Sequence, residues 1–321
     1  MLKYMIFLLE CSRYYALPMT FFSWLIIFTY SLKYGGKPMF GIMALIGIMS
    51  AHLAANLFDD LCDYKILTKI YDKKIVLPNT QRGKCKYLTN GSLSERKALL
   101  LFLFYCLIAF LIGVFFIFKY GLTVLLLMTV GGLIVLFYSF LSYHLMSELA
   151  VGIAFGPLLF FGTYYVMTGK ISSLPLLLSL PSMLFTVNLL YTDTFMDKNI
   201  DKNEGKYTLV NFLGGGEKAL YFQVLILLAG YLSTILLYKY NLSNYKIFFI
   251  ILTIPLAIDL IKSVSLYITS PADLPPKRWY HFPFEYWRDI QENRSVNFMF
   301  RMYQARNLMI YNSLFIFLSV L

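Results

Sequence analysis

Long apolar runs recur along this 321-residue chain, and they constrain its fold more than any other feature. Most of them approach the roughly 20 residues that an α-helix needs to cross the hydrocarbon core of a bilayer. The runs lie at residues 17–34, 39–58, 98–117, 121–142, 148–168, 172–192, 218–238, 246–264 and 307–321. The sequence therefore predicts an all-α fold, a polytopic membrane bundle of about nine transmembrane helices embedded in the lipid bilayer.

The composition excludes several other classes of protein. Hydrophobic residues make up 59% of the chain and charged residues only 14%, whereas soluble domains are about 45–50% apolar and about 25% charged. The four cysteines and three histidines show no spacing typical of a zinc site. Because no internal repeat or separate segment stands out, we expect one domain over residues 1–321.

The basic residues predict the orientation of the bundle. The formal net charge is +11, and 22 of the 28 lysines and arginines fall on the side that carries the N-terminus. The positive-inside rule places that side in the cytoplasm, together with the three long polar loops at 59–97, 193–217 and 265–306. The excess positive charge therefore indicates which side of the bundle faces the cytoplasm, and no nucleic acid partner is expected.

Acidic residues gather at the ends of the second and sixth runs. In the second run Asn56, Asp60 and Asp63 share one helical face, because they are spaced by four and three residues. Asp59 is expected to point about 100° away from Asp60. The sixth run ends in three aspartates spaced by four residues, Asp193, Asp197 and Asp201.

Carboxylates stacked in this way repel one another, and at the C-terminal end of a helix they also meet the negative end of its dipole. A divalent cation offsets both effects, and oxygen ligands select Mg²⁺, which completes its shell with water and phosphate. Both runs end on the same side, so we expect the two clusters to face each other across a central cavity open to the cytoplasm. Two such clusters are what an allylic diphosphate requires as a substrate.

The motifs resemble those of the UbiA superfamily of intramembrane prenyltransferases, a family that also has nine helices. The first motif is Asn56-x-x-x-Asp60, and the second comprises Asp197, Asp201, Gly205, Lys206, Thr208 and Leu209. Three further segments, 12–18, 88–98 and 155–169, are similar to the branch that acts on 1,4-dihydroxy-2-naphthoate in menaquinone biosynthesis. The resemblance implies Mg²⁺-dependent transfer of a polyprenyl group from a polyprenyl diphosphate to an aromatic acceptor, with release of pyrophosphate.

The resemblance also implies roles for particular residues. The expected catalytic set is Asn56, Asp60, Asp63, Asp193, Asp197 and Asp201. Of these, the expected metal ligands are Asp60, Asp63, Asp197 and Asp201. The expected substrate-binding residues are Arg13, Lys84, Lys86, Tyr164, Tyr165 and Lys206. The chain departs from the family pattern at Leu57 and Met196, where the family usually has Asp and the naphthoate branch often has Arg.

Two other functions stay open at this point. A membrane terpene cyclase of the same superfamily would ionise the same diphosphate and close the cation on itself, without an acceptor. A membrane transporter would use intramembrane acidic residues as an ion path. The sequence shows no inverted repeat and no pair of Gly/Pro-broken helices, which are typical of many transporters.

Overall fold

The computed structural model describes residues 2–70, 85–271, 273–284, 290 and 298–321. The all-α prediction is confirmed, because the regular structure in these ranges consists of helices. Eight helices in the described part of the chain are long and apolar enough to cross a membrane. The ninth predicted run forms part of α15 (Phe298–Val320), which has 23 residues.

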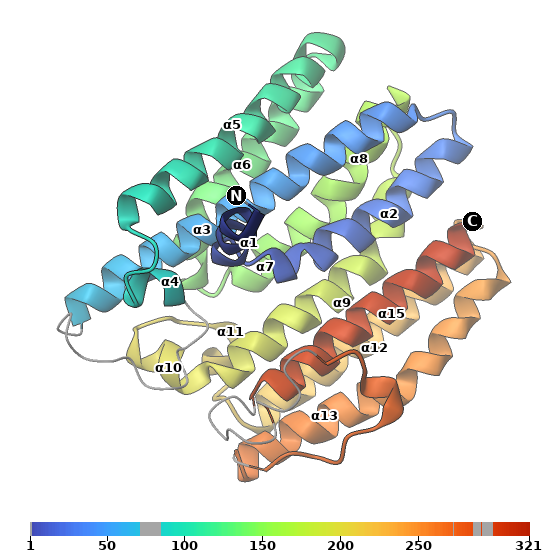
Figure 1. Cartoon of the computed structure of the whole chain (residues 1–321). Coiled ribbons are helices and arrows are strands. Elements are labelled where there is room, and N and C mark those ends of the chain that lie inside the picture. The colour runs from blue at the N-terminus through green and yellow to red at the C-terminus, as the bar shows by residue number, and fades with distance from the viewer. Residues whose placement is uncertain (1, 71–84, 272, 285–289, 291–297) are drawn as a thin grey trace. The chain divides into compact units, whose positions relative to one another are not determined.

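The chain divides into two compact units, each of which is built from two stretches of sequence. The first comprises Met1–Tyr143 and Leu158–Ser172, and the second comprises His144–Pro157 and Ser173–Leu321. The helices of the first unit are α1 (Leu2–Cys11), η1 (Tyr14–Ala16), α2 (Leu17–Lys33), α3 (Pro38–Ile70), α4 (Lys86–Thr89), α5 (Glu95–Tyr120), α6 (Leu122–Ser142) and α8 (Leu159–Thr168) (Figure 1).

The long helix α3 is the central element of the first unit, since α2, α5, α6 and α8 all pack against it. Phe58 of α3 stacks on Phe102 of α5, with 5.0 Å between the ring centroids. The connection before α3 is tied to α8 by a hydrogen bond of 2.9 Å from the Lys37 amide to the Met167 carbonyl. Residues far apart in the sequence therefore meet along α3.

The second unit is organised around α9 (Leu174–Met196). Its other helices are α7 (Ser147–Ile153), α10 (Lys198–Asn203), α11 (Leu209–Phe212), α12 (Glu217–Lys239), η4 (Tyr245–Thr253), α13 (Ile254–Thr269), η5 (Trp279–His281) and α15. Buried Asn188 and Thr192 of α9 accept hydrogen bonds from Gln223 of α12 at 3.1 and 2.9 Å. Bonds of this kind help to join helices whose outer surfaces are apolar.

The segment after α13 folds back along its own helix (Figure 1). His281 lies against Asp259, with 2.9 Å between Nε2 and the carboxylate, and Tyr280 donates a hydrogen bond to the same carboxylate at 2.7 Å. Asp259 lies ten residues before the end of α13, which corresponds to about 15 Å of helix. Asn307 of α15 donates to the His281 carbonyl at 2.6 Å. The long polar segment 265–306 is therefore tied to α13 and α15 at Tyr280 and His281.

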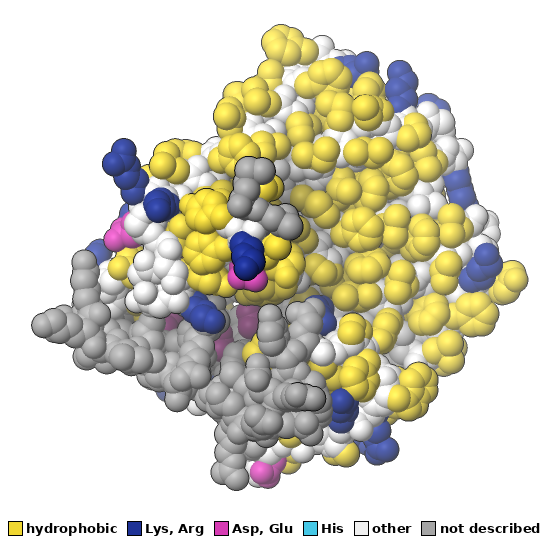
Figure 2. Space-filling view, in the orientation of Figure 1, with side chains coloured by type: hydrophobic (Ala, Val, Ile, Leu, Met, Phe, Trp, Pro, Cys, Tyr) yellow, Lys and Arg dark blue, Asp and Glu magenta, His cyan; other side chains and the backbone are white. Residues whose placement is uncertain are grey.

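Large hydrophobic side chains cover the outer faces of several helices. On α5, Leu103, Phe110 and Phe118 expose 51%, 58% and 89% of their surface. Figure 2 shows hydrophobic side chains over most of the visible face, with many of the lysines and arginines toward its margins. An apolar surface of this extent is unfavourable in water and suits the hydrocarbon of a bilayer. The structure therefore supports an integral, multi-pass membrane protein.

The fifth predicted run, 148–168, forms two helices instead of one. A π-helical turn, η3 (Ala154–Leu158), separates α7 from α8, and within it Gly156 has non-helical backbone angles (φ −102°, ψ −108°). Pro157 follows, and proline has no backbone N–H to continue a helix. A Cβ on Gly156 would lie 2.8 Å from the Cβ of Met183 in α9. The break is therefore a position where only glycine fits without movement of its neighbours.

We expect Gly156→Ala to lower the thermal stability of the protein, because the added methyl group must displace Met183. Overpacking of this kind typically costs about 1–3 kcal/mol. Gly162→Ala in α8 is the matched control, since its Cβ would lie 3.9 Å from Leu127, an ordinary contact. Thermal unfolding in detergent compares the two variants, and equal melting temperatures would contradict the close approach at Gly156.

Candidate active site

Three carboxylates are buried on one stretch of α3 in the first unit. Asp59, Asp60 and Asp63 expose only 7%, 6% and 1% of their surface. Asp60 lies 22 residues after Pro38, or about 33 Å along the helix, which is close to the thickness of a bilayer core. The helix continues to Ile70, so the expected repulsion from a helix C-terminus does not act on this cluster, because the free carbonyls lie further along.

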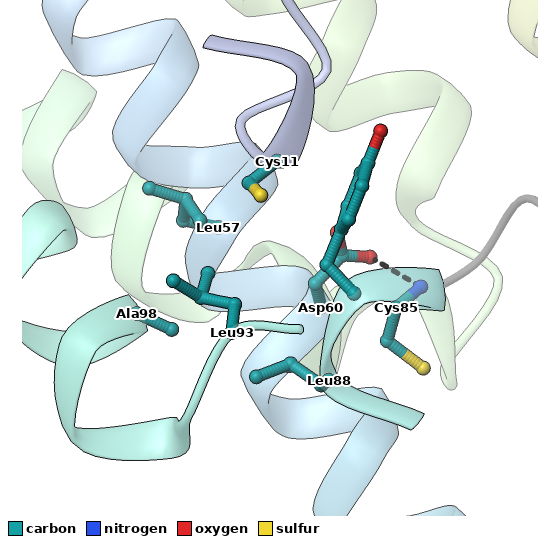
Figure 3. Close-up of a pocket in the computed structure, with 8 residues that line it drawn as sticks. Cys11, Leu57, Asp60, Cys85, Leu88, Leu93 and Ala98 are labelled. Carbon is teal, nitrogen blue, oxygen red and sulfur yellow. Dashed lines mark hydrogen bonds between the residues drawn. The ribbon is translucent and has the colours of Figure 1, made fainter. Parts of the chain in front are cut away.

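Arg13 supplies positive charge to this cluster. Its guanidinium donates a hydrogen bond to Oδ1 of Asp60 and lies 3.5 Å from Oδ2 of Asp59. The backbone amide of Cys85 donates to the same Oδ1 of Asp60 at 3.1 Å, as Figure 3 shows. The Ser139 hydroxyl donates to Oδ1 of Asp59 at 2.9 Å. Arg13, expected from the sequence to contact substrate, is thus paired with carboxylates of its own chain.

Asp59 is part of the cluster, although its helical position predicted that it would point away. The angle between neighbouring residues is indeed about 100°. A guanidinium presents five N–H donors in a wide planar fork, and Arg13 uses that fork to reach both Asp59 and Asp60. The spacing along the helix therefore predicted that Asp59 would lie outside the cluster. The long side chain of Arg13, which comes from another segment, joins Asp59 to Asp60.

The backbone at Arg13 is held in an unusual conformation. Its angles are left-handed (φ 55°, ψ 46°) in the connection between α1 and η1, and such a conformation costs about 1–3 kcal/mol for a residue with a side chain. The Asn56 side-chain amide donates to the Ser12 carbonyl at 3.2 Å, so Asn56 anchors the chain that carries Arg13. Burial alone would lower the pKa of Arg13, but the carboxylates of Asp60 and Asp59 raise it above its ordinary value.

A small pocket borders Asp60. It is lined by Cys11, Leu57, Asp60, Cys85, Tyr87, Leu88, Leu93 and Ala98, and Figure 3 shows the leucines on one side and the Asp60–Cys85 hydrogen bond on the other. Burial, with a further contribution from Glu10 and Asp60, raises the pKa of the Cys11 thiol to about 12. Cys11 is therefore protonated near neutral pH, whereas the nucleophilic form of cysteine is the thiolate.

The second cluster lies where α9 ends. Asp197 occupies the junction between α9 and α10. The Asp197 amide donates to the Asp193 carbonyl at 3.0 Å, and the Asp201 amide donates to the Asp197 carbonyl at 2.8 Å. The predicted spacing by single turns is therefore kept across the junction. The Lys206 amide donates to the Asp201 carbonyl at 2.7 Å, and both of these residues are buried.

Glu148 adds a carboxylate that the sequence analysis did not identify. It lies in the first turn of α7, exposes 6% of its surface, and accepts hydrogen bonds from Ser147 at 2.8 Å and Thr194 at 3.5 Å. Asp201 is within Coulombic range of it. Thr194 is 46 residues away in the sequence, so no local spacing pattern signals this contact.

Lys198 and Tyr267 flank Asp197 and were also missed. The Lys198 ammonium donates to the Gly215 carbonyl at 2.5 Å and lies 5.8 Å from the centre of the Tyr267 ring. The Tyr267 hydroxyl donates to the Met196 carbonyl at 2.8 Å, within Coulombic range of Asp197. Burial lowers the pKa of Lys198. The segment that contains Tyr267 carries no motif that could have indicated this position.

Tyr164 and Tyr165 lie far from Asp60 within the first unit. The Tyr165 ring lies 5.4 Å from that of Tyr120, which in turn lies 6.5 Å from Phe40 near the start of α3. Phe40 precedes Asp60 by 20 residues, or about 30 Å of helix. The structure therefore does not place these two tyrosines, which were expected to bind substrate, next to the carboxylates of α3.

The remaining expected substrate contacts differ in their surroundings. Lys86 is exposed at the start of α4, with its ammonium 6.0 Å from the centre of the Tyr87 ring. Lys84 lies outside the described residues. Lys206 is 7% exposed in the second unit. Of the two lysines that the structure describes here, Lys86 is therefore the one open to solvent or lipid headgroups.

The donor chemistry of the two clusters can be compared with the needs of Mg²⁺. Within the described ranges, no three histidine, cysteine, aspartate or glutamate side chains are grouped so that they could hold a metal ion. Mg²⁺ prefers carboxylate oxygen and usually takes only one or two protein carboxylates, with water and phosphate as its other ligands. Asp60 and Asp63 offer such oxygens in one unit, and Asp197 and Asp201 in the other. The residues present fit Mg²⁺.

The sequence profile of the UbiA prenyltransferase family matches residues 16–287 of this chain. The chain is also similar to the UbiA prenyltransferase domain-containing protein 1 of Xenopus tropicalis, with 27% identity over 226 residues. That alignment covers 68% of this chain but only 61% of the frog protein.

Solved structures share the fold. A UbiA homologue from Aeropyrum pernix K1 matches with a TM-score of 0.60 and 18% identity, over 94% of this chain and 96% of the other. A UbiA homologue from Archaeoglobus fulgidus, bound to DMAPP and Mg²⁺, matches with a TM-score of 0.56 and 15% identity, over 98% of this chain and 99% of the other. These likenesses show that the helices follow a common path.

We expect Ser139→Ala to lower the melting temperature of the metal-free protein, because it removes the hydroxyl that donates to buried Asp59. A buried acceptor that loses its partner typically costs about 1–3 kcal/mol. Ser142→Ala is the control, since that hydroxyl donates only to a backbone carbonyl one turn earlier in its own helix. Equal melting temperatures for the two variants would show that the Ser139–Asp59 bond contributes nothing.

Proposed function

Because the chain belongs to the UbiA prenyltransferase family, we propose that it transfers a polyprenyl group from an allylic diphosphate to an aromatic acceptor. Mg²⁺ is the proposed cofactor and pyrophosphate the second product. The structural relative from Archaeoglobus fulgidus is bound to DMAPP and Mg²⁺, which supports both the donor class and the metal.

The observation that carries this proposal is the burial of Asp60 in α3, a helix long and apolar enough to cross a membrane, and of Asp201 in α10, the short helix that follows α9. Acidic residues inside a membrane helix are expensive and typically mark a functional site. In the proposed role Asp60 and Asp63 bind Mg²⁺ in the first unit, and Asp197 and Asp201 bind Mg²⁺ in the second. When bound, Mg²⁺ neutralises the diphosphate and makes it a better leaving group.

The residues around the clusters have separate proposed tasks. Asn56 positions the chain around Arg13 through its bond to the Ser12 carbonyl. Asp193 lies one turn before Asp197, and its backbone carbonyl accepts a hydrogen bond from the Asp197 amide. Basic residues contact anionic groups of the substrates through charge-assisted hydrogen bonds. The proposed set is Arg13, Lys84, Lys86 and Lys206.

The reaction breaks the bond between the allylic carbon and the diphosphate oxygen and forms a bond to a ring carbon of the acceptor. The ring then loses the group that the new bond replaces. With a simple phenol that group is a proton, and with 1,4-dihydroxy-2-naphthoate it is the carboxylate, which leaves as carbon dioxide. We propose 1,4-dihydroxy-2-naphthoate as the specific acceptor. The segments 12–18, 88–98 and 155–169 support this choice, because they resemble the family branch that acts on this compound.

The proposed orientation places the N-terminus and the active-site loops in the cytoplasm. The distribution of lysine and arginine supports it, with 22 of 28 on that side. A charged, water-soluble acceptor and pyrophosphate would then enter and leave on the cytoplasmic side, while the prenyl chain stays in the bilayer.

We expect Asp60→Asn and Asp197→Asn each to reduce pyrophosphate release about a hundredfold or more, because each variant keeps its shape but loses an anionic oxygen for the metal. The measurement is Mg²⁺-dependent pyrophosphate release from a prenyl diphosphate by purified protein in detergent. Asp273→Asn is the control, since Asp273 is exposed and outside both clusters. Full turnover in either cluster variant would refute the metal assignment.

A product scan by mass spectrometry tests the acceptor. With one prenyl diphosphate donor and Mg²⁺, we expect a prenylated, decarboxylated naphthalenediol from 1,4-dihydroxy-2-naphthoate. Prenylation of 4-hydroxybenzoate and never of the naphthoate would overturn the finer assignment and keep the reaction class. A cyclic hydrocarbon formed without any acceptor would instead favour a terpene cyclase.

A further inference from the structure

Arg13 contacts the carboxylate of Asp60, the same group that is proposed to bind Mg²⁺. The Arg13 guanidinium and the Cys85 amide both donate to Oδ1 of Asp60, and the guanidinium also lies 3.5 Å from Asp59. An arginine in this position compensates two buried carboxylates. Its positive charge also opposes the binding of a second cation, the proposed Mg²⁺, to the Asp60 carboxylate.

The attachment of Arg13 suits a side chain that changes partners. Arg13 belongs to neither α1 nor η1 but to the connection between them, and its side chain is 22% exposed, against 9% for Asp60. Its backbone neighbour Ser12 is buried and held by Asn56. The backbone is therefore anchored, while the end of the side chain has access to the exterior of the cluster.

We propose that Arg13 is an exchangeable counter-ion, which neutralises Asp59 and Asp60 in the metal-free protein and is displaced when Mg²⁺ binds to Asp60. This inference rests on the proposed function, because it requires Asp60 to be a metal ligand. It gives Arg13 a role in the metal-free protein in addition to its proposed contact with the substrate. The arginine and the metal compete for the same carboxylate.

Competition has a thermodynamic consequence. A Mg²⁺ ion that binds to Asp60 must first break the Arg13 contacts, so Arg13 lowers the affinity of the free protein for the metal at this aspartate. The diphosphate compensates for this loss, because its oxygens accept hydrogen bonds from the released guanidinium. Mg²⁺ and diphosphate are therefore expected to bind with positive cooperativity, and the metal-free protein keeps its buried carboxylates neutralised.

The test uses Mn²⁺ alone, as a paramagnetic substitute for Mg²⁺, with purified protein and no substrate. The variants are Arg13→Gln, Arg13→Lys and Asp60→Asn, together with Arg96→Gln as a control for the loss of one positive charge. Arg96 is exposed near the start of α5 in the same unit. Glutamine and lysine meet the same backbone restriction at position 13 as arginine, so the left-handed conformation affects the variants alike.

We expect Arg13→Gln to bind Mn²⁺ about fivefold more tightly or better, the lower end of typical coupling between sites. In the presence of a chelator the same variant should melt at a lower temperature than the wild type, and Mn²⁺ should stabilise it more than it stabilises the wild type. Arg13→Lys should fall between the two, since a single ammonium lacks the planar fork that reaches both carboxylates. Arg96→Gln should bind Mn²⁺ like the wild type.

Unchanged or weaker Mn²⁺ binding by Arg13→Gln overturns the exchange. If Asp60→Asn loses Mn²⁺ binding in the same series, the proposed function stands while this inference falls. If Asp60→Asn binds Mn²⁺ as well as the wild type, Asp60 is not a metal ligand, and the metal assignment and the exchange fail together. Should Arg13→Gln not fold, an Arg13→Lys variant with unchanged Mn²⁺ affinity overturns the exchange.

Discussion

The burial of carboxylates among apolar helices is the constraint on which the first unit depends. A carboxylate taken out of water needs a partner of opposite charge or several hydrogen bonds. Asp59 and Asp60 receive these from Arg13, from the Cys85 amide and from Ser139. The donors belong to the connection after α1, the start of α4 and the helix α6, so the same interactions that compensate the charge also fix these segments against α3.

The positions of the membrane helices were largely predictable, because lipid exposure is a property of a contiguous apolar run. Two features of the helices were not predictable in this way. α3 continues ten residues past Asp60, since polar residues can extend a helix once its apolar part is in place. The fifth run breaks at Gly156, where α9 approaches closely. Pro157 is a local signal that a helix can break there, but the contact with α9 leaves no periodic signal in either helix.

The candidate site was predictable to the extent that it is local. The spacing of Asp193, Asp197 and Asp201 by single turns follows from the sequence and is kept in the backbone hydrogen bonds. The pairing of Arg13 with Asp60 joins residues 47 positions apart, and that of Glu148 with Thr194 depends on how α7 packs on α9. Long-range pairs of this kind determine which charged groups are compensated before a substrate arrives, and local spacing does not encode them.

The most direct test of the account is the position of the metal. Anomalous diffraction at the manganese edge, from crystals grown with Mn²⁺ and a prenyl thiodiphosphate that does not react, locates each ion without reference to activity. The account predicts manganese peaks within bonding distance of the Asp60 and Asp197 carboxylates, with the Arg13 guanidinium withdrawn from Asp60. Bound thiodiphosphate with no manganese at either aspartate, and Arg13 still paired with Asp60, would contradict it.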